Sequence, residues 1–180
     1  MRKLIVAEFI SLDGVVEAPD RWHFPYVNQE MFEVMWAVNA EADTMLLGRV
    51  TYQSYASAFA EAPADDPVAS QMNRPAKVVV SKTLDELEWR NSTLLTGDVV
   101  EQVAKLKERP GAAILVTGSI SLARTLLRAG LVDELNLLVH PIVVGTGQRL
   151  FEGDGVQANL TLASCKALGS GVVHLVYHKA

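Results

Sequence analysis

The stretch from Ala113 to Phe151, AILVTGSISLARTLLRAGLVDELNLLVHPIVVGTGQRLF, decides the fold of this chain. Ala113 to Val116 is an apolar run of strand length, and Thr117-Gly118-Ser119 follows it as a turn and helix start. Apolar residues then recur at helical spacing as far as Gly130, which suits the position just past a helix end. Leu135 to Val144 is a second apolar run. A strand-helix-strand unit in one sheet predicts a parallel pair with a right-handed crossover.

The junction at Gly118 is the first candidate binding site. A helix N-terminus offers unpaired N–H groups and a positive dipole end, and glycine lets a ligand approach the backbone, so an anion is favoured there. Ser119 is expected to cap the helix. A tight strand-to-helix turn also needs glycine and a cap for geometry alone, so this junction by itself leaves both interpretations open.

Composition limits the class of protein. The chain has 180 residues, 49% hydrophobic and 21% charged, which fits one globular domain over residues 1–180. The net charge of −5 and the lack of long Lys/Arg clusters disfavour a nucleic-acid partner. The single Cys165 excludes an internal disulfide and a multi-cysteine zinc site. Neither a signal peptide nor a membrane-spanning run is evident, so we expect a cytoplasmic protein with no membrane partner.

The N-terminal strand is predicted from Leu4 to Ile10, which is apolar apart from Glu8. Ser11-Leu12-Asp13-Gly14 ends this strand. Asp-Gly is first of all a turn signal. A carboxylate at the C-terminal end of a central strand is nevertheless where open α/β sheets place ligand contacts, which makes Asp13 a candidate functional residue.

A second glycine junction follows a predicted strand from Asp43 to Leu47, in the run Gly48-Arg49-Val50-Thr51-Tyr52. Arg49 falls in the first turn of the next helix, where a cation opposes the helix dipole by about 0.3 to 1 kcal/mol unless an anion binds there. A guanidinium matches a phosphate bidentately, and an arginine after such a turn reads the 2′-phosphate that distinguishes NADP from NAD. The alternative is an exposed arginine paired with a carboxylate.

The remaining patterns complete an α/β chain. We expect a helix from Glu30, a surface loop with a short helical turn, two further strands, one more helix and a terminal hairpin. The loop is expected at Ala60–Pro75, the two strands at Lys77–Val80 and Thr93–Leu95, and the second helix at Asp98–Glu108. The terminal antiparallel hairpin is expected to consist of Leu160–Leu168 and Val172–His178.

An aromatic cluster lies in the irregular segment between the first strand and the first helix. Trp22, Phe24 and Tyr26 stand close together there, beside Pro19 and Pro25. Such a cluster forms a stacking wall for a planar ring or simply covers the core under a long loop. No HExxH, CxxC, GxSxG or Walker pattern occurs, so metalloprotease, zinc, serine-hydrolase and P-loop functions have no support, and we expect no metal site.

Taken together, these motifs resemble the dihydrofolate-reductase-like superfamily, and within it the single-domain relatives of the reductase domain of the riboflavin-biosynthesis bifunctional deaminase-reductase. The resemblance spans nearly the whole chain. It is carried by Ser11–Gly14, Asp43 with Leu47–Tyr52, Val79–Leu84, Val116–Ser119, and Gly130–Glu134 leading to Pro141, Gly145, Gly147 and Leu150-Phe151. It implies an α/β three-layer fold with a central, mainly parallel mixed sheet of about eight strands, helices on both faces and a C-terminal antiparallel hairpin.

The resemblance also implies NADPH as the cofactor. The implied contacts are Gly48, Arg49 and Thr51 for the 2′-phosphate and pyrophosphate, Ser81 and Lys82 for the adenosine end, and Gly118 and Ser119 for the pyrophosphate. The nicotinamide would lie beside Ala7 and the loop from Ser11 to Gly14. Two anion-ready junctions agree with a diphosphate ligand.

For the substrate, the resemblance directs attention to Ser11 and to the aromatic wall of Trp22, Phe24 and Tyr26. A proton must also reach the reduced substrate, and Asp13 and Glu30 are the candidate donors. Dihydrofolate reductases place an acid two residues after the proline of a Trp-x-x-Pro turn. Val27 stands at that spacing here.

Two classes of function follow. The first is an NADPH-dependent reductase of a small heterocyclic or carbonyl compound, such as the 5-amino-6-(5-phosphoribosylamino)uracil of riboflavin synthesis, with a dihydrofolate reductase as a variant of the same class. The second is a non-catalytic NADP-binding module, a homodimer packed through its later strands. The lack of an acid at the spacing of Val27 favours the second class. The part of the first hypothesis that rests on the fold alone is an argument by analogy.

Overall fold

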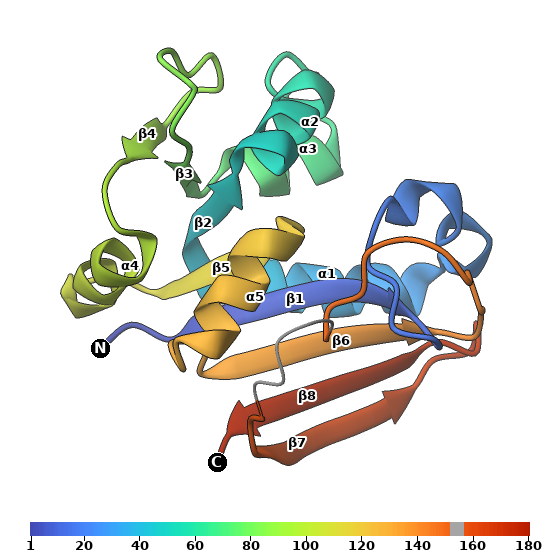
Figure 1. The fold of residues 1–180 in the computed structure, drawn as a ribbon. Coiled ribbons are helices and arrows are strands. Elements are labelled where there is room, and N and C mark those ends of the chain that lie inside the picture. The colour runs from blue at the N-terminus through green and yellow to red at the C-terminus, as the bar shows by residue number, and fades with distance from the viewer. Residues whose placement is uncertain (152–156) are drawn as a thin grey trace.

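The computed structural model describes residues 1–151 and 157–180 as an eight-stranded sheet covered by helices on both faces (Figure 1). The strand order is β4-β3-β2-β5-β1-β6-β8-β7. The strands are β1 (Leu4–Ser11), β2 (Ala42–Gly48), β3 (Ala76–Val80), β4 (Ser92–Leu95), β5 (Ala113–Thr117), β6 (Glu134–His140), β7 (Leu160–Ala167) and β8 (Val173–Lys179). All adjacent pairs are parallel except β6 with β8 and β8 with β7, which confirms the mainly parallel sheet and the terminal hairpin.

The central stretch forms its predicted elements, but β5 and β6 are not paired with each other. The N-terminal strand β1 lies between them and is parallel to both. β6 also ends at His140, before Pro141, so the predicted continuation to Val144 is wrong. A proline has no N–H for the ladder, which explains why the strand stops there.

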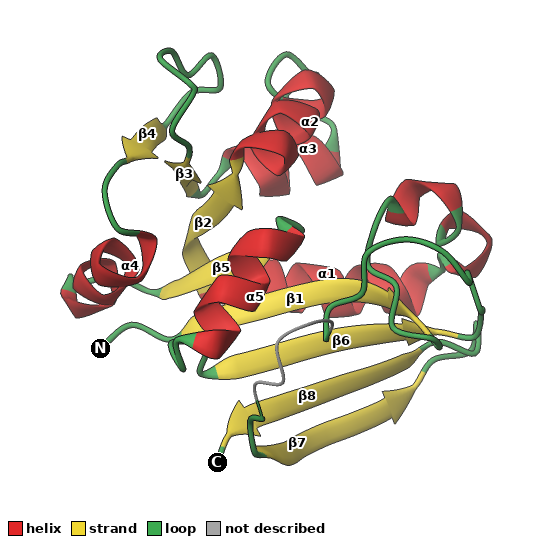
Figure 2. Cartoon of the chain, viewed as in Figure 1, coloured by secondary structure: helices red, strands yellow, loops and turns green. Residues whose placement is uncertain are grey.

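The helices form two outer layers (Figure 2). They are α1 (Gln29–Glu41), α2 (Arg49–Phe59), α3 (Pro67–Asn73), α4 (Val99–Glu108) and α5 (Ile120–Arg128), with two 3₁₀ turns, η1 (Pro19–Arg21) and η2 (Phe24–Tyr26), in the loop after β1. Side chains of α4 and α5 pack with alternate residues of β1 in one core cluster, whereas α1, α2 and α3 cover the other face. This alternation is expected for buried strands.

Local sequence explains where the helices begin and end. Asn28 caps α1, Asp66 caps α3 ahead of Pro67, and Asp98 caps α4, each by accepting a backbone N–H of the first turn. At the end of α5, Gly130 has φ +64°, and its N–H and that of Leu131 bond to the carbonyls of Leu127 and Leu126. This Schellman arrangement confirms the predicted helix stop.

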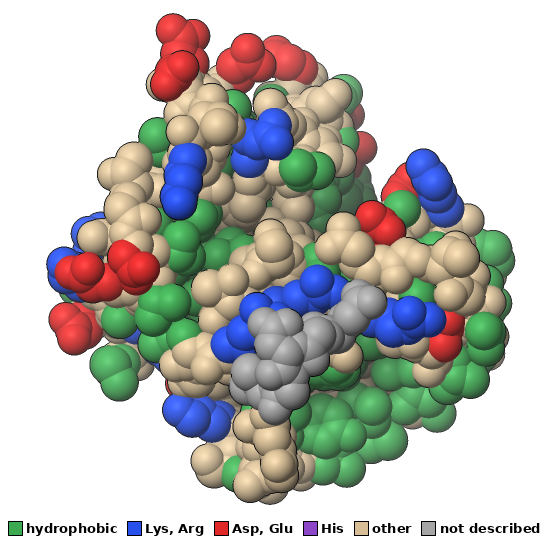
Figure 3. Space-filling view, viewed as in Figure 1, with side chains coloured by type: hydrophobic (Ala, Val, Ile, Leu, Met, Phe, Trp, Pro, Cys, Tyr) green, Lys and Arg blue, Asp and Glu red, His purple; other side chains and the backbone are tan. Residues whose placement is uncertain are grey.

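The β8-β7 end of the sheet carries apolar side chains at the surface (Figure 3). Leu160 and Leu162 of β7 are 38% and 51% exposed. Within the described residues, no helix is long and apolar enough to cross a membrane.

Candidate functional site

The two glycine junctions meet at one place in the molecule. Gly48 ends β2 and Gly118 follows β5, and these two strands are neighbours in the sheet. The Gly48 N–H donates to Ser119 Oγ over 2.7 Å. A Cβ added at Gly118 would lie 3.1 Å from Thr51 Cγ2. The starts of α2 and α5 therefore touch each other across the carboxyl end of the sheet, which is where parallel sheets bind ligands.

The hydroxyl of Ser119 does not cap α5, contrary to the sequence expectation. Ser119 occupies the cap position with φ +61°, and its side chain accepts from Gly48 and not from the first turn of its own helix. Gly48, at the start of α2, has no side chain with which to cap. Of the five α-helices in the described ranges, the two that lack a side-chain cap are the two that meet here. Their first-turn N–H groups are left for a ligand.

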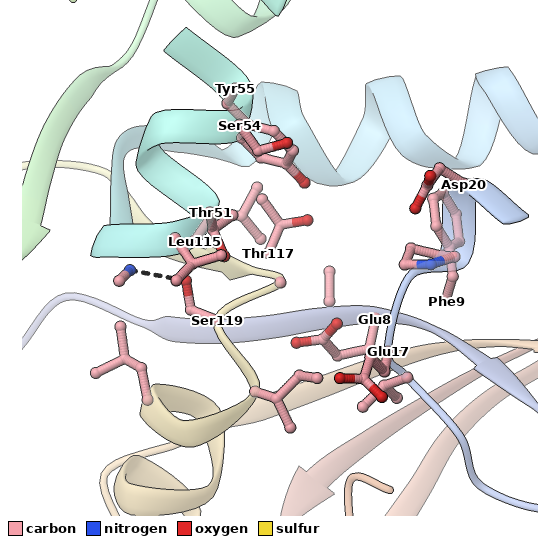
Figure 4. A pocket seen from close by; sticks show the side chains of 18 of the residues that line it. Glu8, Phe9, Glu17, Asp20, Thr51, Ser54, Tyr55, Leu115, Thr117 and Ser119 are labelled. Carbon is pink, nitrogen blue, oxygen red and sulfur yellow. Dashed lines mark hydrogen bonds between the residues drawn. The ribbon is translucent and has the colours of Figure 1, made fainter. Parts of the chain in front are cut away.

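A cavity of about 1400 Å³ opens beside these helix starts (Figure 4). It runs from the segment after β3, past α2 and α5, to β1 and the loop that follows β1. Its volume exceeds that of a typical ligand pocket and leaves room for more than one small molecule. The charged side chains in its described lining are Glu8, Glu17, Asp20, Arg49 and Lys82.

The strand β1 presents an open edge to this cavity. β1 pairs with β5 only from Leu4 to Ala7, whereas its pairing with β6 continues to Ser11. Beyond Ala7, no strand in the described part of the chain therefore lies on the β5 side of β1. The N–H and C=O of Ser11 are bonded to Val15 and Gly14, so the open part of this edge lies between Ala7 and Ser11. Because strand N–H and C=O groups that lack a ladder partner remain available, a planar ligand amide can pair with this part.

Glu8 is the acidic residue buried in the cavity wall, and the sequence analysis did not single it out as functional. Its side chain projects from β1 and the residue is only 6% exposed. Burial raises the pKa of the Glu8 carboxyl to about 8, against a smaller lowering by the N–H of Gly118. The sequence signal that could have identified it is that Glu8 is the one charged residue in the otherwise apolar stretch from Leu4 to Ile10. Such a shift, in a cleft, is typical of functional carboxyls.

Tyr55 of α2 belongs to the same part of the cavity. Burial raises the pKa of its hydroxyl, which also interacts with the Thr117 side chain and the Glu8 carboxyl. The cavity thus holds two hydrogen-bonding acids, Glu8 and Tyr55, on opposite walls (Figure 4).

The predicted cofactor residues all line the cavity. Ala7, Gly48, Arg49, Thr51, Ser81, Lys82, Gly118 and Ser119 are all part of its wall. Arg49 is exposed and makes no hydrogen bond or ion pair with any residue in the described ranges, so the alternative of a carboxylate-paired arginine loses its support. The Ser81 hydroxyl is already used, because it accepts the N–H groups of Thr83 and Leu84 and shapes the turn after β3.

The aromatic segment is divided between the cavity and the core. Phe24 and its neighbour His23 line the cavity, and His23 stacks on Phe9 with a centroid separation of 4.6 Å. Trp22 and Tyr26 lie elsewhere, each packed edge-on against the fully buried His140. Their rings therefore support the loop from beneath, and the predicted three-residue wall is reduced to Phe24.

The predicted proton donors lie outside the cavity lining. Asp13 accepts the N–H groups of Val144 and Gly145 and the hydroxyl of Ser11, which together lower its pKa to about 2. A carboxyl that remains ionised at neutral pH cannot donate a proton there. Ser11, expected at the substrate, is 1% exposed and belongs to this same turn.

Glu30, the other predicted donor, lies at the start of α1. Its Oε2 accepts the N–H of Gly169 over 2.6 Å, so it ties α1 to the turn between β7 and β8. Like Asp13, it positions backbone and does not reach the cavity lining.

Strained backbone is concentrated at the cavity. Ala18, Asn91 and Ser119 are the described non-glycine residues with positive φ, and two of them, Ala18 and Ser119, line the cavity. Left-handed conformations of such residues cost of order 1 kcal/mol and often mark functional sites.

Gly118→Ala is expected to lower the free energy of unfolding by about 2 kcal/mol, because alanine disfavours φ +64° and its Cβ would press on Thr51. Gly145→Ala is the matched control, since Gly145 has φ +83° but open space around its missing Cβ. It is expected to cost about 1 kcal/mol. Urea unfolding of both variants measures the difference, and equal losses would show that the contact with Thr51 is unimportant.

Comparison with known proteins identifies the family. The family model for the RibD C-terminal domain matches residues 2–174. The chain belongs to the RibD C-terminal domain family. Uncharacterized protein YyaP of Bacillus subtilis (strain 168) is 29% identical over 191 residues, covering 98% of this chain and 95% of YyaP.

Solved structures agree with this family on the fold. The Thermotoga maritima diaminohydroxyphosphoribosylaminopyrimidine deaminase/5-amino-6-(5-phosphoribosylamino)uracil reductase matches with a TM-score of 0.73 at 12% identity, over 99% of this chain and 57% of that one. Enterococcus faecalis dihydrofolate reductase, complexed with NADP(H), matches with a TM-score of 0.65 at 14% identity, over 98% and 96% of the two chains. This RibD C-terminal domain relative therefore has the dihydrofolate-reductase-like fold that its motifs implied.

Proposed function

We propose that this chain is an NADPH-dependent reductase of a small heterocyclic or carbonyl compound. The observation that carries the proposal is the meeting of two helix starts without side-chain caps, joined by the Gly48–Ser119 hydrogen bond, at a cavity lined by Arg49, which has no partner among the described residues. Two adjacent sets of free N–H groups suit a diphosphate, and a nearby guanidinium suits a further phosphate. Membership of the RibD C-terminal domain family supports the same function.

The residues have distinct proposed tasks. Gly48, Thr51, Gly118 and Ser119 bind the pyrophosphate, Arg49 binds the 2′-phosphate, and Ser81 and Lys82 flank the adenosine. NADPH supplies a hydride when bound. The open edge of β1 beyond Ala7 orients the nicotinamide amide. Phe24 and the walls of the cavity hold the substrate and exclude water, which brings the reacting groups together.

The first substrate to test is 5-amino-6-(5-phosphoribosylamino)uracil, the compound named for the reductase of the Thermotoga maritima structure. Titration of the protein with NADPH and NADH, followed by tryptophan quenching, tests cofactor binding. A panel of pyrimidinones, dihydropterins including dihydrofolate, and aldehydes then tests turnover through loss of absorbance at the NADPH band. Failure of NADPH to bind would refute the proposal. Binding without oxidation by any of these compounds would favour the non-catalytic NADP-binding module.

We further propose that the chain forms a homodimer through the apolar β8-β7 face. Leu162→Asp places a charge on this face, where the leucine is 51% exposed, and is expected to convert the dimer to a monomer. Light scattering after gel filtration measures the mass. A wild-type monomer at micromolar concentration would refute this part of the proposal.

A further inference from the structure

Glu8 is positioned to contact whatever binds at the start of α5. The Gly118 N–H lies close enough to this carboxyl to oppose the rise in its pKa, and Gly118 belongs to the junction that we assign to the pyrophosphate. The Glu8 Oε1 has no hydrogen-bond partner among the described residues, although the residue is 6% exposed. A buried carboxyl with one unused oxygen at an anion-binding junction requires an explanation, because an unsatisfied buried polar atom costs free energy.

An ionised Glu8 and a diphosphate are incompatible at this junction. Both would be anions at the same helix start, and repulsion between like charges is strong where water is excluded. A neutral carboxyl has no such conflict, since it offers an O–H that can donate to a phosphate oxygen.

We propose that Glu8 is a cofactor-binding residue that donates a hydrogen bond to the dinucleotide diphosphate as a neutral acid, so that NADPH binding requires a proton on Glu8. This inference rests on the proposed function and adds a residue and a proton to it. The proton comes from solvent when the free protein holds Glu8 ionised, and it returns to solvent when the cofactor leaves.

The surroundings of Glu8 favour the neutral acid. Besides Glu8, the titratable side chains of the lining near it are Tyr55 on the opposite wall (Figure 4), Glu17, Asp20 and His23 of the loop after β1, and His174 of β8. Tyr55, Glu17 and Asp20 supply no positive charge, and burial lowers the pKa of both histidines, which favours their neutral form. From β5, β6 and α5 the lining residues are all uncharged, among them Leu115, Thr117 and Asn136. The cations Arg49 and Lys82 belong to the helix start of α2 and the segment after β3. Burial without a cationic partner keeps the pKa of Glu8 near 8.

The test is the pH dependence of NADPH affinity. If only the protonated protein binds, the dissociation constant rises roughly 30-fold from pH 7 to pH 9.5, in proportion to the loss of the competent form. Glu8→Gln keeps a hydrogen-bond donor without a titrating group, so its affinity is expected to stay constant over this range. The 2′-phosphate has lost its second proton by pH 7 and contributes equally to both proteins.

Proton uptake provides a second, independent measurement. Calorimetric titrations with NADPH at pH 8, in two buffers of different ionisation enthalpy, are expected to show uptake of about half a proton by the wild type and none by Glu8→Gln. Glu17→Gln is the matched control, a second cavity glutamate, and should take up the same half proton as the wild type. Glu8→Leu has no donor, so it should bind more weakly than Glu8→Gln and without pH dependence.

Each outcome is decisive. A wild-type affinity that is constant from pH 7 to pH 9.5, or a Glu8→Gln variant that keeps the wild-type dependence, overturns the role of Glu8 and leaves the reductase proposal standing. Absence of NADPH binding by folded wild-type protein at every pH overturns both. Thermal unfolding of each variant verifies that it is folded.

Discussion

Glu8→Gln is expected to exceed the wild type in free energy of unfolding at pH 9 by about 5 kcal/mol, with little difference at pH 4.5. Folding raises the pKa of this carboxyl from 4.5 to about 8, since the folded chain removes it from water. The folded state therefore binds the proton more tightly than the unfolded state. Its contribution is complete below pH 4.5 and is lost as the pH rises through 8. Glutamine has no proton to lose, so its stability lacks this decline.

Urea unfolding of both proteins at pH 5, 7 and 9 measures the effect. The control is Glu33→Gln on α1, where the glutamate is exposed and, among the described residues, is bonded only to Gln29. The free energy of unfolding of this variant should stay within about 0.5 kcal/mol of the wild type. A constant difference between Glu8→Gln and wild type across the pH range would contradict a buried, neutral Glu8. A confirmed gain would mean that the wild type retains a destabilising residue for its function.

Arg49→Ala is expected to weaken NADPH binding roughly 100-fold, or by about 3 kcal/mol, while NADH binding is unchanged. The guanidinium at the first turn of α2 has no partner in the described chain, so the 2′-phosphate would be its principal contact. NADH lacks that phosphate, so the affinity of the protein for NADH should not change with the substitution. Competition titrations of the two dinucleotides give both constants.

Two variants sharpen this result. Arg49→Lys keeps the charge but loses the bidentate fork, and an intermediate affinity for NADPH is expected. Arg109→Ala removes an exposed arginine after α4, outside the cavity lining, and should leave both affinities unchanged. Equal losses for NADPH and NADH on Arg49→Ala would refute the assignment of Arg49 to the 2′-phosphate.

Local sequence patterns predicted most of the elements and both glycine junctions. The structure confirms the features that depend only on residues close together in the sequence. These are the helix ends at Asp98 and Gly130, the strand from Leu4 and the terminal hairpin. The loop from Ala60 to Pro75 contains a full helix, α3, because Asp66 and Pro67 start one there.

The features that sequence could not supply are long-range. Ser119 was expected to cap its own helix, but its hydroxyl instead accepts an N–H from Gly48, 71 positions earlier. The insertion of β1 between β5 and β6 likewise depends on packing that no local pattern encodes. The position of Asp13 in the sequence is that of a ligand-binding carboxylate. Only the fold shows that its carboxylate oxygens accept the backbone N–H groups of Val144 and Gly145. Glu8 became a candidate only when its burial was known.

The unmatched edge of β1 has one more consequence. On an outer surface, a strand with free backbone groups would recruit other chains and promote aggregation. Here the open part of β1, between Ala7 and Ser11, borders the cavity through Glu8 and Phe9, beside α2 and the loop after β1. A foreign polypeptide strand would have to displace those elements, whereas a flat amide on a small ring would not. The fold thus prevents the unpaired edge of β1 from pairing with another chain, while small molecules can still reach it.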